Sequence, residues 1–367
     1  MQHTLLSNLD ELLSPKTLTR ITGVDVVSAE RLPLNAGFAH SGSSLEFISC
    51  LGPGGHPGPR LVLKRVAADW DWLMRVTEDT HCRSVGLWTQ GLFDRLPAVC
   101  EPPVLACSSD GAGWAVLMQD YGASLMTSMS FSPQANRLFL DAAAAMHAEF
   151  LDDPALAAKE LGLCRPEHVY GMFSPATARA EIARGHSGEI PARILEGWEL
   201  AHEVMPVDVM QVIGPLVQDS SPLCDALRRY PATLVHGDFR HSNLALSPER
   251  EHPLKVVLLD WQLAACAPPA VELGRYLGAN SPLLPVSKDQ CLSYYRERFF
   301  EAAPAAAGVQ DWWNAQQDLG LLGGFVQDGW AIVLKATHWH VGADAREHWK
   351  ADLDWWAEQV RRGAHWL

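Results

Sequence analysis

Two acids and an amide stand in an order that suits phosphoryl transfer. Asp238 lies just after the short apolar run at 234–235, and Asn243 comes five residues later. Asp260 ends a second apolar run at 256–259. In loops with this spacing, one acid accepts the proton of a substrate hydroxyl, while the amide and the second acid hold magnesium. The rest of the chain can be tested against this chemistry.

A lysine in an apolar strand is the next candidate. Lys64 lies in the predicted strand at 60–66, where a lysine is usually solvated at a strand edge. Its place, after a glycine-containing segment, is also that of the lysine that pairs with nucleotide phosphates. That segment, at 35–44, contains Gly37 and Gly42, whose backbone N–H groups could approach an anion closely. A plain hairpin turn is the alternative for this segment.

The elements that must position these residues begin with a β-rich third of the chain. Glycine-containing turns separate strand candidates at 24–29 and 44–50 from the strand that carries Lys64. The turn at 51–59 has four glycines and three prolines. It is interpreted as a hairpin connection rather than a phosphate loop, because no Gly-Lys-Ser/Thr follows it. A second hairpin is predicted with its turn at 108–113.

Helical patterns dominate the remainder. A long helical region is expected at 71–96, and an alanine-rich helix at 133–150 contains His147, which is interpreted as a packed core residue. The segment 287–367 is helical and rich in tryptophan. These rings are expected in the core, with a cation-binding aromatic pocket as the alternative. A metal site at His338-Trp-His340 is not favoured, since no third ligand is in sight.

Composition narrows the class of protein. The formal charge is −14, from 29 basic and 43 acidic residues, which argues against nucleic acid and anionic membranes as partners. The eight cysteines form no C-x-x-C pair and are expected to be free thiols. The first residues do not have the pattern of a signal peptide, and no apolar run is long enough to span a bilayer. We therefore expect a cytoplasmic protein.

The chain resembles the aminoglycoside phosphotransferase and choline-kinase-like family. Three features carry this resemblance, in this order along the sequence: the glycine segment, the strand lysine, and the run from His236-Gly-Asp to Asp260-Trp. The resemblance extends from about Leu34 to about Gly278. It implies an α+β, bilobal protein kinase-like fold with a β-rich N-lobe and a mainly helical C-lobe. It also implies ATP or GTP as phosphoryl donor, together with magnesium.

Carried over to this chain, the family pattern makes Asp238 the catalytic base and Asn243 and Asp260 the magnesium ligands. Lys64 would bind the donor phosphates, together with the glycine segment. The hinge residues that would bind the nucleotide base are consecutive in the sequence: Gln119, Asp120 and Tyr121. The hinge sets the expected domain boundary, with an N-lobe at 1–119 and a C-lobe at 120–367.

One departure concerns the acid that should hold Lys64. Relatives usually carry Glu where this chain has Ser84, so either Glu78 supplies the partner or the pair is absent. A nucleotide-binding pseudokinase is therefore one alternative function. Another, a binuclear metal-dependent phosphatase, is not favoured because further His and Asp ligands are missing.

The expected activity is transfer of the γ-phosphoryl group of a nucleoside triphosphate to a hydroxyl of a small molecule. An aminoglycoside or another aminosugar or cationic acceptor is suggested by the negative net charge and the aromatic C-terminal segment. The sequence gives no indication of oligomeric state.

Overall fold

The structure is a computed structural model that describes residues 3–34, 41–126, 130–185, 188–247, 253–309 and 311–367. By internal contacts the chain divides into two compact units. Unit 1 comprises Met1–Leu125, Ala158–Gly162 and Ala245–Gln262. Unit 2 comprises Met126–Ala157, Leu163–Leu244 and Leu263–Leu367. Each unit is described by itself, and the domain boundary expected after residue 119 stays a prediction.

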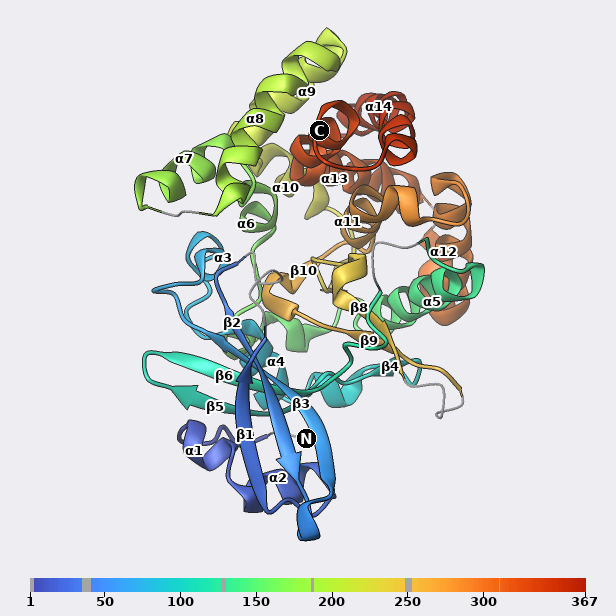
Figure 1. Ribbon diagram of the computed structural model, residues 1–367. Coiled ribbons are helices and arrows are strands. Elements are labelled where there is room, and N and C mark those ends of the chain that lie inside the picture. Colours follow the sequence, from blue (N-terminus) through green and yellow to red (C-terminus); the bar gives the residue numbers. More distant parts are fainter. Residues whose placement is uncertain (1–2, 35–40, 127–129, 186–187, 248–252, 310) are drawn as a thin grey trace. The chain divides into compact units, whose positions relative to one another are not determined.

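A five-stranded antiparallel sheet forms the centre of unit 1 (Figure 1). In spatial order its strands are β1 (Ser28–Pro33), β2 (Ser44–Leu51), β3 (Pro57–Val66), β6 (Gly113–Gln119) and β5 (Val104–Asp110). The predicted hairpin with its turn at 108–113 is confirmed as β5 and β6. The segment at 51–59 joins the paired strands β2 and β3, which confirms the hairpin interpretation.

The central strand explains the position of Lys64. Lys64 pairs with Leu45 on β2 and with Val116 on β6. Because side chains alternate along a strand, Lys64 shares one face of the sheet with Val116, while Leu63 points to the other. Leu63 is fully buried, so the apolar alternation that marked this strand in the sequence also fixes which way the lysine faces.

The helices of unit 1 differ from the long helix expected at 71–96. The described helices are α1 (Leu9–Leu12), α2 (Pro15–Thr22), α3 (Trp72–Val76) and α4 (Arg83–Thr89). The chain breaks between α3 and α4, where Glu78 and Cys82 both have positive φ, a backbone conformation that cannot continue a right-handed helix. The strand predicted at 24–29 is present but displaced toward the C-terminus, since β1 begins only at Ser28.

A second, smaller sheet of three strands carries Asp260. Its strands are β4 (Cys100–Glu101), β9 (Val256–Leu258) and β8 (Leu244–Leu246), and β4 pairs with β9 in parallel. All three residues of β9 are buried, as its continuous apolar sequence predicts. Asp260 follows two residues after this strand.

Unit 2 is mainly helical. Its helices are α5 (Pro133–Glu149), α6 (Pro166–Gly171), α7 (Pro175–Ala183), α8 (Glu189–Val204), α9 (Val207–Gln218), α10 (Ser221–Leu227), α11 (Ala270–Asn280), α12 (Lys288–Ala302), α13 (Asp311–Thr337) and α14 (Ala343–Ala364). The antiparallel strands β7 (Thr233–Val235) and β10 (Ala265–Ala267) pair beside them. The alanine-rich helix predicted at 133–150 is confirmed as α5.

Glycines set the packing of α11 on α13. A Cβ atom on Gly274 would lie 2.4 Å from the carbonyl oxygen of Gly320, and one on Gly324 would lie 2.7 Å from the Cα of Gly274. The two helices therefore meet backbone to backbone, which only residues without a side chain allow. This contact places α11 and its polar residues against α13.

Most C-terminal tryptophans belong to the core, as expected. Trp312, Trp313, Trp330, Trp349 and Trp356 are buried. All eight cysteines are free thiols, as expected. Among the residues that the structure describes, no helix has the length and apolar character needed to cross a membrane.

Candidate active site

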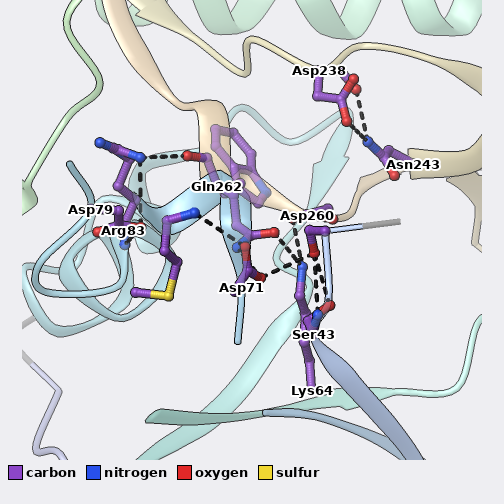
Figure 2. Close-up of polar contacts among 12 residues, drawn as sticks. Ser43, Lys64, Asp71, Asp79, Arg83, Asp238, Asn243, Asp260 and Gln262 are labelled. Atoms are coloured by element: carbon purple, nitrogen blue, oxygen red, sulfur yellow. Dashed lines mark hydrogen bonds and ion pairs between the residues drawn. The ribbon is translucent and has the colours of Figure 1, made fainter. Parts of the chain in front are cut away.

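Lys64 lies at the centre of a polar network in unit 1 (Figure 2). Its Nζ lies 2.8 Å from Oδ1 of Asp260 and donates a 2.9 Å hydrogen bond to Oε1 of Gln262. The amide nitrogen of Gln262 in turn donates to Oδ2 of Asp71, over 2.9 Å. Gln262 therefore links the strand lysine to a buried acid at the start of α3.

This network provides the partner for Lys64 that the sequence left open. Glu78 is exposed on the turn after α3, and the partners found for Lys64 are Asp260 and Gln262. Ser84 is part of the lining of the same cavity as Lys64. Its hydroxyl does not take the role of the missing carboxylate. Sequence reasoning missed Gln262, although it directly follows the Asp-Trp pair.

Charge stabilises the protonated lysine. Burial alone would lower the pKa of Lys64, but Asp260 and Asp71 outweigh it and hold the pKa above its ordinary value. For Asp71, burial dominates and raises the pKa. Lys64 is therefore a fixed positive charge at neutral pH, suited to binding phosphate oxygens.

The backbone around Asp260 is held in an unusual conformation. Asp260 has φ of +63°, which is rare for a residue other than glycine and is typical of functional sites. Next to it, Arg83 donates from Nη1 to the main-chain oxygen of Gln262 over 2.8 Å. The same guanidinium binds Thr77 and the carbonyl oxygen of Gly162. Arg83 thus fixes the turn that presents Asp260 and Gln262.

A small cavity in unit 1 lies beside this network. Its polar lining residues are Lys64, Cys82, Ser84, Asp260 and Gln262, and its apolar ones are Val66, Pro103, Val104, Val116, Met118 and Trp261. Val116 is the cross-strand partner of Lys64, so the lysine-bearing face of the sheet forms one wall. An apolar surface next to a fixed cation suits a ligand with a flat ring and a charged tail.

The predicted hinge residues lie next to this cavity in sequence but are not among its described lining residues. The N–H of Asp120 donates to the carbonyl oxygen of Arg60, and its carboxylate pairs with the Arg60 guanidinium at 2.9 Å. Tyr121 is buried and its hydroxyl donates to Glu101. Gln119 pairs with Leu61 on β3. Their proposed contact with a nucleotide base stays a prediction.

The glycine segment is only partly described. Gly37 lies outside the described residues. Gly42 has φ of +96°, and a Cβ atom there would lie 2.3 Å from the carbonyl oxygen of Trp70. Close packing therefore explains this glycine without a phosphate. Next to it, Ser41 donates to Oδ2 of Asp71 over 3.0 Å, which ties the end of the segment to the network around Lys64.

In unit 2, Asp238 is held by three side chains. Arg275 donates to its Oδ1 from Nε at 3.0 Å and from Nη2 at 2.6 Å. The amide nitrogen of Asn243 donates to Oδ2 at 2.7 Å, as drawn in Figure 2, and Arg240 approaches the same oxygen at 3.3 Å. Burial alone would raise the pKa of Asp238, but Arg240 and Arg275 outweigh it and hold the pKa below its usual range. Asp238 is thus an ionised, oriented acceptor.

Helix α11 braces the loop that carries Asp238. The backbone N–H groups of His236 and Gly237 both donate to the carboxylate of Glu272, at 2.5 and 3.1 Å. From the end of the same helix, Asn280 accepts from the N–H of His241 at 2.7 Å. His147 lies 3.7 Å from Glu272 and contacts the Tyr295 hydroxyl, which supports the core role predicted for it. Sequence reasoning missed Arg275 and Asn280, since spacing alone does not reveal them.

The candidate metal ligands suit magnesium in their chemistry. Asn243 turns its amide nitrogen toward Asp238, which leaves its carbonyl oxygen for another partner. The Asp260 side chain is 31% exposed, so its carboxylate is accessible. Magnesium prefers such oxygen ligands and is often bound by one or two protein groups together with substrate phosphates. Among the described residues, no cluster of three or more His, Cys, Asp or Glu could hold a metal by itself; His338 instead binds Glu196.

The chain is similar to several known proteins in sequence or in structure. A stretch of 133 residues is 32% identical to acyl-CoA dehydrogenase family member 10 of Mus musculus, and it covers 35% of this chain but only 12% of that protein. The structure is similar to an ethanolamine kinase from Plasmodium vivax (TM-score 0.51, 13% identity, 94% of this chain and 89% of that one). A choline kinase from Cryptosporidium parvum matches with a TM-score of 0.49, 11% identity, and coverage of 91% and 89%.

These findings confirm the fold expected from the sequence. The chain has the protein kinase-like fold of small-molecule kinases, with a sheet-rich N-terminal region and a mostly helical C-terminal part. The profile of the phosphotransferase enzyme family (APH) matches residues 56–312. Because this match covers most of the chain and both sets of candidate site residues, the protein belongs to the phosphotransferase enzyme family.

Proposed function

We propose that the protein transfers the γ-phosphoryl group of ATP or GTP to a hydroxyl of a small molecule. The observation that carries the proposal is the buried, ionised carboxylate of Asp238, which Arg275 and Asn243 hold in one orientation. Membership of the phosphotransferase enzyme family supports it, and so does the cation-lined apolar cavity in unit 1.

In the proposed reaction, the acceptor hydroxyl oxygen forms a bond to the γ-phosphorus while the bond from that phosphorus to the β-phosphate oxygen breaks. The products are a phosphate ester and a nucleoside diphosphate. Asp238 orients the hydroxyl and accepts its proton as the new bond forms. Since its pKa is low, Asp238 is a weak base, and positioning contributes more than proton abstraction.

Lys64 would bind phosphate oxygens of the donor, and the apolar residues that line the cavity would contact its base. Asn243 and Asp260 would hold magnesium, which neutralises charge on the phosphates when bound. Gly37 and Gly42 remain candidates for the phosphate loop, and Gln119, Asp120 and Tyr121 remain candidates for the hinge. The 31% exposed carboxylate of Asp260 and the free amide oxygen of Asn243 support the metal assignment.

The pseudokinase alternative rested on Ser84 in place of an acid. Because Lys64 is held by Gln262 and Asp260 instead, the lysine does not need that acid to stay oriented. An aminoglycoside or other cationic acceptor is the class that net charge suggests. The cations next to Asp238 favour a different class of acceptor.

A screen of acceptors tests the proposal. The protein is incubated with Mg-ATP or Mg-GTP and a library of sugars, aminosugars, amino alcohols, hydroxy acids and aminoglycosides, and each mixture is searched by mass for the gain of one phosphate. We expect at least one product in the wild type and none with Asp238→Asn. Asp225→Asn, which removes an exposed acid on α10, should match the wild type. Nucleotide binding without any product would support the pseudokinase instead.

A further inference from the structure

The proposed base Asp238 and the neighbouring acid Asp328 both pair with one arginine. Arg275 uses Nε and Nη2 on Asp238 and Nη1 on Asp328 of α13. Both acids therefore share one buried guanidinium, whose side chain is 8% exposed. Oδ2 of Asp328 is buried and has no hydrogen-bond partner among the described residues, so a cationic acceptor would have to reach this one oxygen or compete with Arg275 for the others.

Two cations of the same region have donors to spare. Arg240 places only its Nε near Asp238, at 3.3 Å, and its side chain is 32% exposed. Lys335, near the end of α13, has neither a hydrogen bond nor an ion pair with any residue that the structure describes. Burial lowers the pKa of Lys335 to about 8, although Asp328 acts in the opposite direction and Arg275 and Arg240 lower it further. Lys335 lies two turns after Asp328 on the same helix, so the two residues share one face of α13, and Asp328 contacts the same Arg275 that holds Asp238.

The position of the Lys335 ammonium is defined by an aromatic ring. Its Nζ lies 4.4 Å from the centre of the Trp349 ring, on α14, and Trp349 is 2% exposed. A cation–π contact of this kind recovers only part of the cost of partial burial. A half-buried cation is costly unless a counter-ion pairs with it, and no described residue lies within ion-pair distance of Lys335, although Asp328 acts on it from further away.

The aromatic residues do not offer an empty cage for a cationic acceptor. Four of the C-terminal tryptophans hold a cation of the chain itself: Trp349 holds Lys335, Trp355 holds Lys288, Trp339 holds Arg193 and Trp313 holds Arg296. These four rings are therefore already in contact with a cation of the chain.

From this arrangement, and resting on the proposed function, we infer that the acceptor is a hydroxy compound that carries an anionic group, a carboxylate or a phosphate, which Lys335 and Arg240 bind while the hydroxyl lies at Asp238. The anion is the missing counter-ion of Lys335. Arg275 is not part of this contact, because its donors are used on Asp238 and Asp328.

Binding of matched acceptors tests the inference without requiring turnover. Two sets of compounds are matched in skeleton and differ in charge. The three-carbon set comprises glycerate and glycerol 3-phosphate (anionic), glycerol (neutral) and 3-amino-1,2-propanediol (cationic). The six-carbon set comprises gluconate and glucose 6-phosphate (anionic), glucose (neutral) and glucosamine (cationic). Saturation-transfer NMR with the full chain gives the affinity of each at millimolar concentration. We expect an anionic member to bind at least about tenfold more tightly than its neutral and cationic counterparts, which is the effect of about 1.4 kcal/mol. The carboxylate and phosphate members separate the two anion classes.

Variants then assign the contact. Lys335→Gln should remove the preference for the anion, whereas Lys335→Arg keeps the charge and should retain most of it. Arg240→Gln should weaken binding of the anionic member more than binding of the neutral one. Lys350→Gln, which removes an exposed cation of α14 paired with Glu347, should have no effect. For any anion that is phosphorylated, Lys335→Gln should raise KM about tenfold or more and change kcat little.

Three outcomes would overturn the inference: no anionic member binds, the cationic members bind as tightly, or Lys335→Gln weakens all members equally. The proposed function fails separately, when acceptors bind but no phosphate ester forms. Selective anion binding with no transfer would thus leave the inference standing and remove the enzyme assignment.

Discussion

At the scale of single residues, the structure places each candidate in a network rather than alone. Lys64 is held by Asp260 and Gln262, and Asp238 by Arg275 and Asn243. The bridging residues Gln262 and Arg275 each connect a candidate to a further buried acid. Orientation of the reacting groups therefore depends on residues that do not themselves react.

Two substitutions compare Gln262, which binds Lys64 in the structure, with Glu78, the partner that the sequence suggested for Lys64. Gln262→Ala removes one hydrogen bond to a lysine and one to an acid, and bonds to charged groups contribute about 1.5–3 kcal/mol each. We expect KM for the nucleotide to rise by about tenfold or more. Glu78→Ala, at an exposed position, should leave KM unchanged. Steady-state kinetics with varied nucleotide measures both. An effect of Glu78→Ala equal to that of Gln262→Ala would contradict the network.

Lys335 gives a pH dependence of stability whose sign follows from its pKa of about 8. In the unfolded chain a lysine has a pKa of about 10.4, so between pH 8 and that value the unfolded state binds more protons and stability rises with pH. Below pH 8 the charged side chain destabilises the folded state. We expect Lys335→Met to melt at a higher temperature than the wild type near pH 7, with a smaller difference near pH 10. Melting curves at the two pH values test this. A difference that grew with pH would show that a counter-ion already stabilises the ammonium.

At the scale of elements, α11 is the part that organises unit 2. Its Glu272 binds the backbone of the loop before Asp238, its Arg275 binds Asp238 itself, and its Asn280 binds the loop after it. The glycines of α11 and α13 set how closely these two helices pack against each other. A shift of α11 would therefore move all three contacts together.

A methyl group at the glycine contact tests this dependence. Gly274→Ala places a carbon 2.4 Å from the carbonyl oxygen of Gly320, and overpacking of this kind costs about 1–3 kcal/mol. We expect a lower melting temperature and a fall in kcat, because α11 must move. Gly214→Ala on α9 meets nothing within 4 Å and should be neutral or stabilising by about 0.5–1 kcal/mol. Thermal melting curves and steady-state kinetics of both variants test this prediction. Unchanged kcat in Gly274→Ala would mean that α11 does not position Asp238.

At the scale of the whole molecule, nucleotide binding should raise the free energy of unfolding and therefore the melting temperature. A ligand at about 100 times its Kd stabilises the folded state by about 2.7 kcal/mol. We expect Mg-ATP or Mg-GTP to raise the melting temperature of the wild type and of Asp238→Asn alike, because Asp238 serves the acceptor. Lys64→Met should lose most of the shift. A shift that depended on Asp238 and not on Lys64 would reverse the proposed roles.

The family and the fold were predictable because a few residues at fixed spacing carry them. The run from His236 to Asp260-Trp and the strand lysine indicate both, since alternation and short apolar runs determine strands locally. The break between α3 and α4 was not predictable, because positive φ at Glu78 and Cys82 depends on packing and not on propensity.

The site was predictable only where residues lie in the motifs. Asp238, Asn243, Lys64 and Asp260 could be proposed because they stand in motifs. Arg275 and Lys335 lie on helices, whose apolar periodicity reveals burial and not polar partners. The groups next to Asp238 include the cations Arg240 and Arg275, although the whole chain has a net charge of −14. Net charge is a sum over all residues and does not describe the charge of one site. This is why the acceptor class inferred from composition differs from the one inferred from contacts.

The central claim is that Asp238 directs a γ-phosphoryl group to a hydroxyl. Its most direct test is a ³¹P NMR spectrum of the protein with Mg-nucleotide and pooled acceptors, for the wild type and Asp238→Asn. The account predicts a phosphate ester and nucleoside diphosphate in equal amounts with the wild type, and no ester with the variant, which still binds nucleotide. Inorganic phosphate as the sole product of the wild type, or an undiminished ester signal with Asp238→Asn, would contradict it.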